Sequence, residues 1–273
     1  MISRPGPEVL AAFGVPRAVS RPLPGGQGTT WMAGDVVLKP VSSVVEAEWV
    51  GSILCYLRER GCRVSRPIRS SAGTWTAQGW AAWEIVDGGH DFSSRWPDVL
   101  AAGAAFHTTL RDITRPAFLD ARDDVWSVGD RAAWDDAPPG VIHDAFGPVA
   151  EQLAAVRSPS RLPSQVVHGD LTGNVLFADG ADPAIIDFVP YWRPVEFASA
   201  IVVADAIAWH KAGSDLARSL PSVEDPRSML ARAAIYRLIT SDRTAAGRTE
   251  GKAKYLRDNV EANYRVLSAV RAM

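Results

Sequence analysis

Residues Val166–Phe177 read Val-Val-His-Gly-Asp-Leu-Thr-Gly-Asn-Val-Leu-Phe, and this stretch decides how the rest of the chain is interpreted. Its carboxylate, Asp170, and its amide, Asn174, close a loop that contains glycine and leads at once into an apolar segment. A second carboxylate, Asp187, follows Asn174 by thirteen residues, at the end of the next apolar segment. A short β-pair formed by the two segments would bring all three side chains to the same rim.

That set of side chains suits phosphoryl transfer. Carboxylate and amide oxygens are hard ligands of the kind that Mg²⁺ prefers, and one carboxylate remains to act as a base. Phosphoryl transfer needs a metal ion to neutralise the phosphate oxygens and a carboxylate to orient the attacking hydroxyl. For Asp170 or Asn174 alone, capping of backbone groups in a turn is the simpler interpretation. The whole arrangement favours a catalytic site.

The composition is that of an ordinary globular protein. The chain has 273 residues, of which 47% are hydrophobic and 22% charged, and its formal net charge is −2. This balance gives no electrostatic reason to expect a nucleic acid or an anionic membrane as a partner. No apolar run approaches the ~18 residues of a membrane span, and the first residues lack the apolar stretch of a signal peptide. Cys55 and Cys62 are the only cysteines, so we expect reduced thiols and a cytoplasmic protein.

The order of the expected elements indicates an α+β fold. The first third is rich in strand-like segments with one helix among them, and the remainder is mainly helical. The expected strands are 18–23, 29–33, 36–39, 62–69, 74–86, 175–177 and 184–188. The expected helices are 43–60, 97–111, 145–157, 195–212, 226–242 and 252–272. A β-rich part followed by a helical part argues for two lobes with a cleft, which we assign to residues 1–86 and 87–273.

The motif His168-Gly169-Asp170, with Asn174 and Asp187, resembles the catalytic and metal-binding motifs of the aminoglycoside phosphotransferase family, relatives of the protein kinases. The resemblance, to an actinobacterial-type branch, implies a protein-kinase-like two-lobed fold, with an N-terminal antiparallel sheet with one helix and a mainly helical C-terminal lobe. It implies that ATP and Mg²⁺ are cofactors, that Asp170 is the catalytic base, that Asn174 and Asp187 hold Mg²⁺ and that His168 supports the loop. Family members commonly have one more residue between the Asp and the Asn, so this loop is shorter.

Lys39 and a glutamate of the following helix agree with the same interpretation. Lys39 ends an apolar strand, where an ammonium group is costly without an anionic partner. In the expected helix 43–60, Glu46 shares its face with apolar residues and Glu48 does not, so we expect Glu46 to face the core and Glu48 the solvent. We therefore predict a Lys39–Glu46 ion pair, which in the family holds the lysine against the α- and β-phosphates of ATP. An ordinary surface lysine and a solvated glutamate are the alternative.

A glycine-rich loop and a strand end complete the predicted nucleotide site. Gly25, Gly26 and Gly28 lie where the nucleotide-covering loop of the family would lie, although such a hairpin is often only a turn. The strand 80–86, which ends in Asp87-Gly88-Gly89, resembles the interlobe hinge of the family. This resemblance implies that the backbone of Glu84 and Val86 contacts adenine. The sequence contains no G-x-x-x-x-G-K-[ST] motif, which excludes the P-loop route to nucleotide binding.

Two segments bear on the substrate. The aspartates between Asp120 and Asp136 stand near Trp126 and Trp134 and could bind an amino sugar, although a solvated connection between helices is the simpler interpretation. The segment Gly247–Met273 is basic and would repel a polycation wherever it borders the pocket. We therefore expect the substrate hydroxyl to belong to a neutral or singly charged sugar, amino sugar or amino alcohol.

Two alternatives remain beside this small-molecule kinase: a catalytically silent nucleotide-binding or regulatory module of the same fold, and a true aminoglycoside-resistance kinase. A silent relative would have lost one of the residues that carry the chemistry, whereas the full set is present, and this favours an enzyme. A protein kinase is disfavoured, because the loop has the His-Gly-Asp form and no Asp-Phe-Gly triplet follows it.

Overall fold

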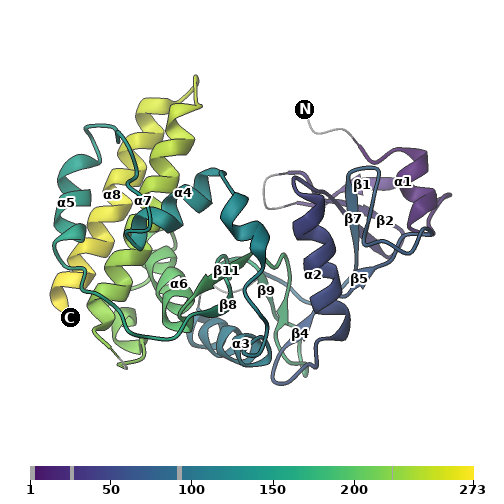
Figure 1. Cartoon of the computed structure of the whole chain (residues 1–273), viewed down its shortest axis with the longest axis horizontal. Coiled ribbons are helices and arrows are strands. Elements are labelled where there is room, and N and C mark those ends of the chain that lie inside the picture. The colour runs from purple at the N-terminus through teal and green to yellow at the C-terminus, as the bar shows by residue number, and fades with distance from the viewer. Residues whose placement is uncertain (1–3, 25–27, 91–93, 223) are drawn as a thin grey trace. The chain divides into compact units, whose positions relative to one another are not determined.

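The computed structural model describes residues 4–24, 28–90, 94–222 and 224–273 (Figure 1). These residues form two compact units: unit 1 comprises Met1–His90 and Val175–Phe188, and unit 2 comprises Asp91–Asn174 and Val189–Met273. The expected division at 86/87 assigned Val175–Phe188 to the helical part. In the structure β10 (Ala184–Ile185) pairs in parallel with β4 (Arg63–Val64), and this pairing brings the segment into unit 1.

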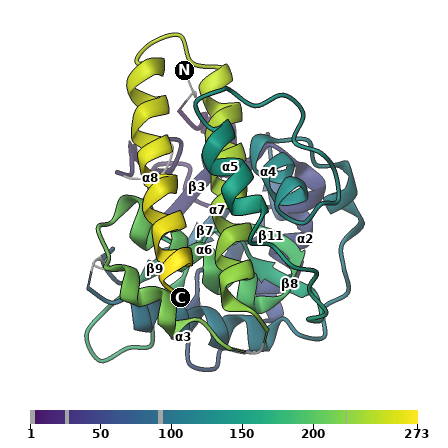
Figure 2. The ribbon, with the colours of Figure 1, turned by 90° about the vertical axis from the view of Figure 1, so that its left-hand side faces the viewer.

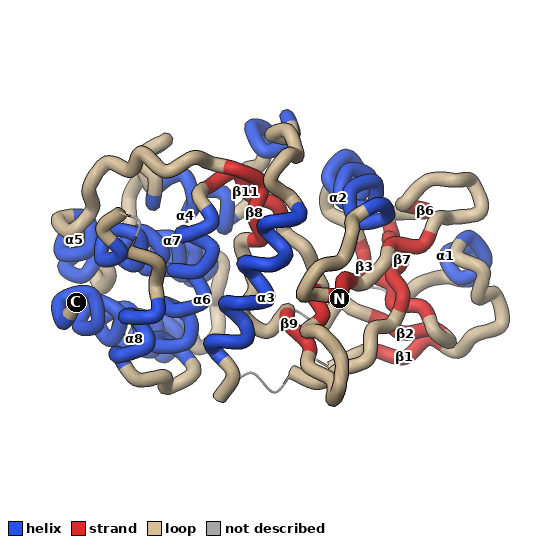
Figure 3. The backbone as a smooth tube through the Cα atoms, turned by 90° about the horizontal axis from the view of Figure 1, so that it is seen from below, coloured by secondary structure: helices blue, strands red, loops and turns tan. Residues whose placement is uncertain are grey.

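Unit 1 contains an antiparallel sheet, which Figure 3 shows together with α1 (Pro7–Ala12) and α2 (Val44–Tyr56). Its strands follow the order β1 (Ser20–Pro22), β2 (Trp31–Ala33), β3 (Val36–Pro40), β7 (Trp80–Glu84) and β5 (Pro67–Ile68), and β6 (Thr76–Ala77) pairs with β7. In β3, Val36 and Leu38 are buried and Val37 between them is only partly buried, as expected when one face of a pleated strand covers a core. Helix α1 adds Val9 and Leu10 to that core.

Helix α2 begins where the sequence predicts and ends earlier. The hydroxyl of Ser43 accepts a hydrogen bond of 3.3 Å from the backbone N–H of Glu46, as an N-cap should. The expected end at residue 60 is wrong, because Tyr56 is the last helical residue. The guanidinium of Arg66 donates to the carbonyls of Leu54 and Leu57 at 2.6 and 3.0 Å. These carbonyls at the helix end therefore find their partner outside the helix.

The β-pair expected after the glycine loop is present. Strand β9 (Val175–Leu176) runs antiparallel to β10, with Leu176 opposite Ala184, and β4 extends them to a three-stranded sheet. Asp187 follows β10 by two residues, and this small sheet therefore sets its position within unit 1.

Unit 2 is mainly helical. Figure 2 shows α7 (Pro226–Ala246) and α8 (Lys252–Ala272) side by side, with α5 (Gly147–Ala154) and α6 (Val195–Trp209) in contact with them. Eleven residues of α6 are buried, and all but one of them are apolar, as expected of a central helix. The remaining elements of unit 2 are α3 (Trp96–Thr109), η1 (Ala117–Ala121), α4 (Val125–Ala133), β8 (Gln165–His168), β11 (Pro190–Arg193) and η2 (Ser214–Ser219).

Helix α4 lies in a segment for which the sequence analysis expected no element. Its start has a recognisable signal, because the carboxylate of Asp124 accepts hydrogen bonds from the backbone N–H groups of Trp126 and Ser127 at 3.0 and 2.9 Å. No helix within the described residues combines the length and the apolar composition that crossing a membrane requires.

Candidate active site

Lys39 and Asp187 form an ion pair within unit 1. Lys39 lies on β3 and Asp187 follows β10, and the lysine Nζ is 2.6 Å from the carboxylate Oδ2. Asp187 has a φ of 53°, in the left-handed region, where non-glycine residues often mark a functional site. The two side chains are 27% and 45% exposed. A cation and a hard oxygen ligand are therefore held together at an accessible point of unit 1.

The structure pairs Lys39 with Asp187 rather than with Glu46, the partner that the sequence predicts. Glu46 lies in the first turn of α2 and is half-buried. The helical periodicity could only distinguish between the glutamates of α2 as partners of Lys39. It could not include a carboxylate that folding brings to Lys39 from a strand far along the chain.

The expectation that Glu48 faces the solvent is wrong. Its carboxylate accepts hydrogen bonds from the backbone N–H of Trp75 at 3.1 Å and from the hydroxyl of Thr76 at 2.6 Å. Gly51, one turn further along α2, lies so close to the ring of Trp75 that a Cβ there would come within 2.4 Å of it. The segment that leads into β6 therefore covers the face of α2 that the sequence assigned to water.

The predicted adenine-contacting residues lie at the end of β7. Glu84 donates its N–H to the carbonyl of Arg66 at 2.8 Å, and its own carbonyl accepts from the hydroxyl of Ser65 at 2.8 Å. A carbonyl oxygen has two lone pairs, so this one can still accept a second hydrogen bond. The N–H of Val86 has no hydrogen-bond partner among the described residues. These two groups can therefore form one donor–acceptor edge.

The glycine-rich loop is described only in part, because Gly25 and Gly26 lie outside the described residues. Gly28 has a φ of 70°, a conformation that favours glycine. The backbone N–H of Leu23 donates to the carbonyl of Thr30 at 2.9 Å, which closes the hairpin at its base.

The predicted catalytic loop lies in unit 2 and is held by hydrogen bonds. His168 is completely buried, and its Nδ1 accepts a hydrogen bond of 3.1 Å from the backbone N–H of Asp170. The side-chain amide of Asn174 donates to the carbonyl of Asp170 at 2.7 Å, and its backbone N–H donates to the carbonyl of Leu171 at 2.9 Å. Four-residue spacing therefore gives a closed turn, and His168 is placed to support it.

A second histidine supports the first. Nε2 of His107, on α3, accepts a hydrogen bond of 3.0 Å from the backbone N–H of His168. Burial, and to a lesser degree the charge of His168, lowers the pKa of His107 from 6.5 to about 3. His107 is therefore neutral at physiological pH, as its acceptor role requires.

Arg237, on α7, binds two carboxylates. Its Nη2 donates to Asp170 at 2.8 Å, and its Nε and Nη2 donate to Asp205 at 2.8 and 2.6 Å. Burial alone would lower the pKa of the guanidinium, but the charge of Asp205 raises it well above the usual value. The side chain of Asp170 is 41% exposed. One oxygen of Asp170 is thus engaged by Arg237, and the carboxylate can still accept a further hydrogen bond from a ligand.

The sequence profile of the phosphotransferase enzyme family (APH) matches residues 21–199. The matched segment covers more than half of the chain and includes Lys39, Asp170, Asn174 and Asp187. The chain belongs to this phosphotransferase family. No curated protein sequence matches it at a significant level.

Solved structures of other phosphotransferases have a similar fold. The spectinomycin phosphotransferase APH(9)-Ia, crystallised with ADP and spectinomycin, has 13% sequence identity and a TM-score of 0.58, and the match covers 97% of this chain and 95% of that one. A thermostable mutant of APH(4)-Ia, crystallised with AMP-PNP and hygromycin B, has 14% identity and a TM-score of 0.58, with 93% of each chain covered. A choline/ethanolamine kinase family protein from Mesorhizobium loti has 15% identity and a TM-score of 0.58, with 95% and 94% covered. The expected α+β, protein-kinase-like fold is confirmed.

The sequence analysis of this phosphotransferase missed Arg237. A signal was present, because Asp205 interrupts an otherwise apolar helix and is only 3% exposed in the structure. A buried carboxylate requires a cationic partner. The sequence could not say which arginine supplies it, since Arg237 lies on a different helix, thirty-two residues further along the chain.

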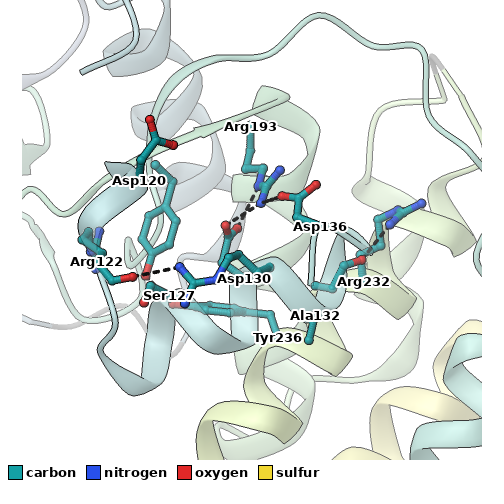
Figure 4. A network of polar contacts seen from close by, with 12 residues as sticks. Asp120, Arg122, Ser127, Asp130, Ala132, Asp136, Arg193, Arg232 and Tyr236 are labelled. Atoms are coloured by element: carbon teal, nitrogen blue, oxygen red, sulfur yellow. Dashed lines mark hydrogen bonds and ion pairs between the residues drawn. The ribbon is translucent and has the colours of Figure 1, made fainter. Parts of the chain in front are cut away.

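In the phosphotransferase, aspartates of the segment between Asp120 and Asp136 form ion pairs with arginines of the chain. Arg115 binds Asp120. Arg193 binds both Asp130 and Asp136 (Figure 4). Trp134 packs against the core of unit 2 and lies under the guanidinium groups of Arg193 and Arg232. The carboxylates and the indole are thus engaged by arginines of the protein itself, which weakens the idea that they bind an amino sugar.

Proposed function

We propose that this phosphotransferase transfers the γ-phosphate of ATP to a hydroxyl group of a small molecule. The observation that carries the proposal is Asp170 in its hydrogen-bonded loop, inside a segment that matches a phosphotransferase family. Asp170 accepts the proton of the substrate hydroxyl while that oxygen bonds to the γ-phosphorus and ADP leaves. The hydrogen bond from Arg237 orients the carboxylate of Asp170. Because the guanidinium keeps its proton, Asp170 remains able to act as a base.

The residues proposed for the nucleotide keep the roles that the sequence suggested. Lys39 binds the α- and β-phosphates, and the backbone of Glu84 and Val86 contacts adenine. The Lys39–Asp187 ion pair supports placing the phosphates at Lys39, because it shows that the ammonium group is available to an anion in this conformation. Glu46 remains a proposed partner of Lys39 when nucleotide is bound.

Asn174 and Asp187 are the proposed ligands of Mg²⁺, and their chemistry fits this ion. Asn174 uses its amide nitrogen for the carbonyl of Asp170, which leaves its oxygen free to act as a ligand. Asp187 offers a half-exposed carboxylate. When bound, Mg²⁺ would neutralise charge on the phosphate oxygens.

The proposed substrate is a sugar, an amino sugar or an amino alcohol. The names of the structural relatives cover such compounds, since they include a spectinomycin phosphotransferase and a choline/ethanolamine kinase family protein. Asp120, Asp130 and Asp136 already form ion pairs with arginines of the chain, so they are not available to bind the ammonium groups of a polycation. This favours a neutral or singly charged compound.

The test is ADP release from Mg·ATP with a panel of sugars, amino sugars, amino alcohols and aminoglycosides. Asp170→Asn keeps the shape of the side chain and removes the proton acceptor, so kcat should fall by ~10²–10⁴-fold while ATP affinity changes little. Substrate-dependent ADP release that is unchanged in Asp170→Asn would refute the assignment of the base. Wild-type protein that neither binds Mg·ATP nor releases ADP with any compound would refute the function.

A further inference from the structure

A cavity of about 350 Å³ lies within unit 2, lined by residues of η1, α4 and β11 and of the connections around η1 and α4. Tyr191 lines the cavity, and its ring packs so closely on Gly169 that a Cβ at Gly169 would come within 2.3 Å of the ring. Gly169 directly precedes Asp170 in the chain. The cavity is therefore next to the loop that carries the proposed base, and its volume suits a small molecule.

Two of the arginines that line the cavity have an aspartate each. Nη1 and Nη2 of Arg115 donate to the two carboxylate oxygens of Asp120, which also lines the cavity. Nε of Arg122 is 3.0 Å from the carboxylate of Asp124, the N-cap of α4. These pairs leave no net charge.

The other two lining arginines balance two further aspartates. Arg193 is shared by Asp130 and Asp136, and each carboxylate lies 2.6 Å from its Nη2 (Figure 4). One guanidinium offsets only one of these two negative charges. Arg131, on the same helix as Asp130, lines the cavity and offsets the other. The charged groups of the described lining, counted with Asp124, therefore sum to zero.

A charged ligand would disturb this balance. An ammonium group would add a positive charge that no carboxylate is left to compensate, and a carboxylate would add a negative charge in the same way. A charge that enters such a site loses its hydration and finds no opposite charge in return. A neutral ligand does not meet this cost.

The ion pairs retain hydrogen-bonding capacity that hydroxyl groups can use. An ionised carboxylate can accept about four hydrogen bonds. The exposed Asp120 accepts two from the arginines and Asp136 accepts one. Arg131 donates from Nη1 to a backbone carbonyl, and a guanidinium has further N–H donors. Since a hydroxyl both donates and accepts, neighbouring hydroxyls of one ligand can bind a carboxylate and a guanidinium together. Leu119 and Trp192 add apolar surface for its C–H groups.

We infer that this cavity binds the acceptor substrate and that this substrate is a neutral polyhydroxy compound, a sugar or a sugar alcohol, rather than an amine or an acid. The inference rests on the proposed function and narrows it, because it removes the amino sugars and amino alcohols. The specificity comes from the balance of charges within the lining.

The test measures ADP release with two sets of compounds whose members differ in charge at one carbon. One set is sorbitol, gluconate and 1-amino-1-deoxysorbitol, and the other is glucose, glucuronate and 6-amino-6-deoxyglucose. The wild-type kcat/KM should be roughly tenfold or more higher for the neutral member of each set, the cost of one buried group left without a partner. A wild-type enzyme that prefers the acid or the amine would overturn the inference.

Two variants change the charge of the cavity in opposite directions. Arg131→Gln leaves one negative charge in excess, so turnover of the amine relative to the neutral compound should rise roughly fivefold. Asp136→Asn leaves one positive charge in excess, so the acid should gain instead. High salt should weaken both gains, because salt screens the attraction. A merely structural role of either side chain would change turnover of all three compounds alike.

Arg257→Gln is the matched control and should keep the wild-type order of the compounds. Arg257 is an exposed arginine on α8, which contributes no described residue to the lining. Melting temperatures establish which variants are folded, and either of the two charge variants is decisive by itself. An unchanged order of the three compounds in a folded Arg131→Gln or Asp136→Asn would overturn the inference.

Calorimetry of the sorbitol set with nucleotide-free protein distinguishes a failure of the inference from a failure of the proposed function. Binding that favours sorbitol and shifts with charge in the two variants, without ADP release from any compound, would support the cavity and refute the phosphotransfer. ADP release whose charge preference neither variant changes would support the phosphotransfer and overturn the cavity. If no compound is bound or phosphorylated, both are refuted.

Discussion

Arg237 donates a hydrogen bond of 2.8 Å to the carboxylate of Asp170, while the same guanidinium holds the buried carboxylate of Asp205 at 2.6 Å. The orientation of an exposed acid is thus tied to an ion pair in the interior of unit 2. We therefore predict that Arg237 is a positioning residue, which acts through Asp170. Its substitution should change both the stability of the protein and the rate of the reaction.

Arg237→Ala should lower the free energy of unfolding by ~3–5 kcal/mol, because it leaves the carboxylate of Asp205 buried without a partner. Urea denaturation measures this loss. Arg237→Lys keeps the positive charge but not the geometry of the fork, so it should recover part of the stability and still show a reduced kcat. The KM for ATP should stay unchanged in Arg237→Lys. The exposed Arg227→Lys, on the same helix, is the control, and an equal kcat in the two lysine variants would contradict the positioning role.

Asp187→Asn should nearly abolish turnover while the fold survives. Asparagine has the same shape and tolerates the left-handed backbone conformation that Asp187 adopts with a φ of 53°. Binding of Mg·ATP raises the melting temperature of the wild-type protein by mass action, and this shift should be smaller in the variant. Asp182→Asn, in the exposed turn of the same β-pair, should behave like wild type. A full Mg·ATP shift in Asp187→Asn would contradict its role as a metal ligand.

Glu48→Ala should destabilise the protein by ~1–3 kcal/mol, because the backbone N–H of Trp75 and the hydroxyl of Thr76 lose their acceptor. The kcat and the KM for ATP of the folded fraction should not change. Glu46→Ala, two positions earlier on α2, should instead weaken nucleotide binding if Glu46 assists Lys39. Chemical denaturation and ATP titration of both variants separate the structural role from the nucleotide-binding role. Equal stability and equal ATP affinity of the two variants would contradict these separate roles.

His107 predicts how stability depends on pH. The folded protein holds the pKa of His107 at about 3, whereas the ordinary value of 6.5 applies to the unfolded chain. The unfolded state therefore binds more protons in this interval, so the contribution of His107 lowers stability as the pH falls from about 6.5 towards 3. Urea midpoints at several pH values in this range should fall less steeply in His107→Gln, whose amide oxygen can still accept from His168. Parallel curves for wild type and variant would refute this explanation.

The sequence alone determined the class of fold and the hydrogen-bonded loop that carries the proposed base, because both depend on local signals. The spacing of Asp170 and Asn174 in a glycine-containing loop, followed by an apolar strand, is a short-range pattern that keeps its meaning in any context. The order of the segments, strand-like in the first third and mainly helical in the remainder, was likewise enough for an α+β assignment.

The tertiary structure decided which charged groups meet. Lys39 pairs with Asp187 rather than with Glu46, and Glu48 binds the segment before β6 rather than water. Each of these contacts joins elements far apart in the sequence, and an ion pair or hydrogen bond leaves no periodic trace in either element. The same holds for Arg237 and Asp170. A charged side chain finds its partner through the packing of whole helices and strands, so its partner becomes known only when that packing is known.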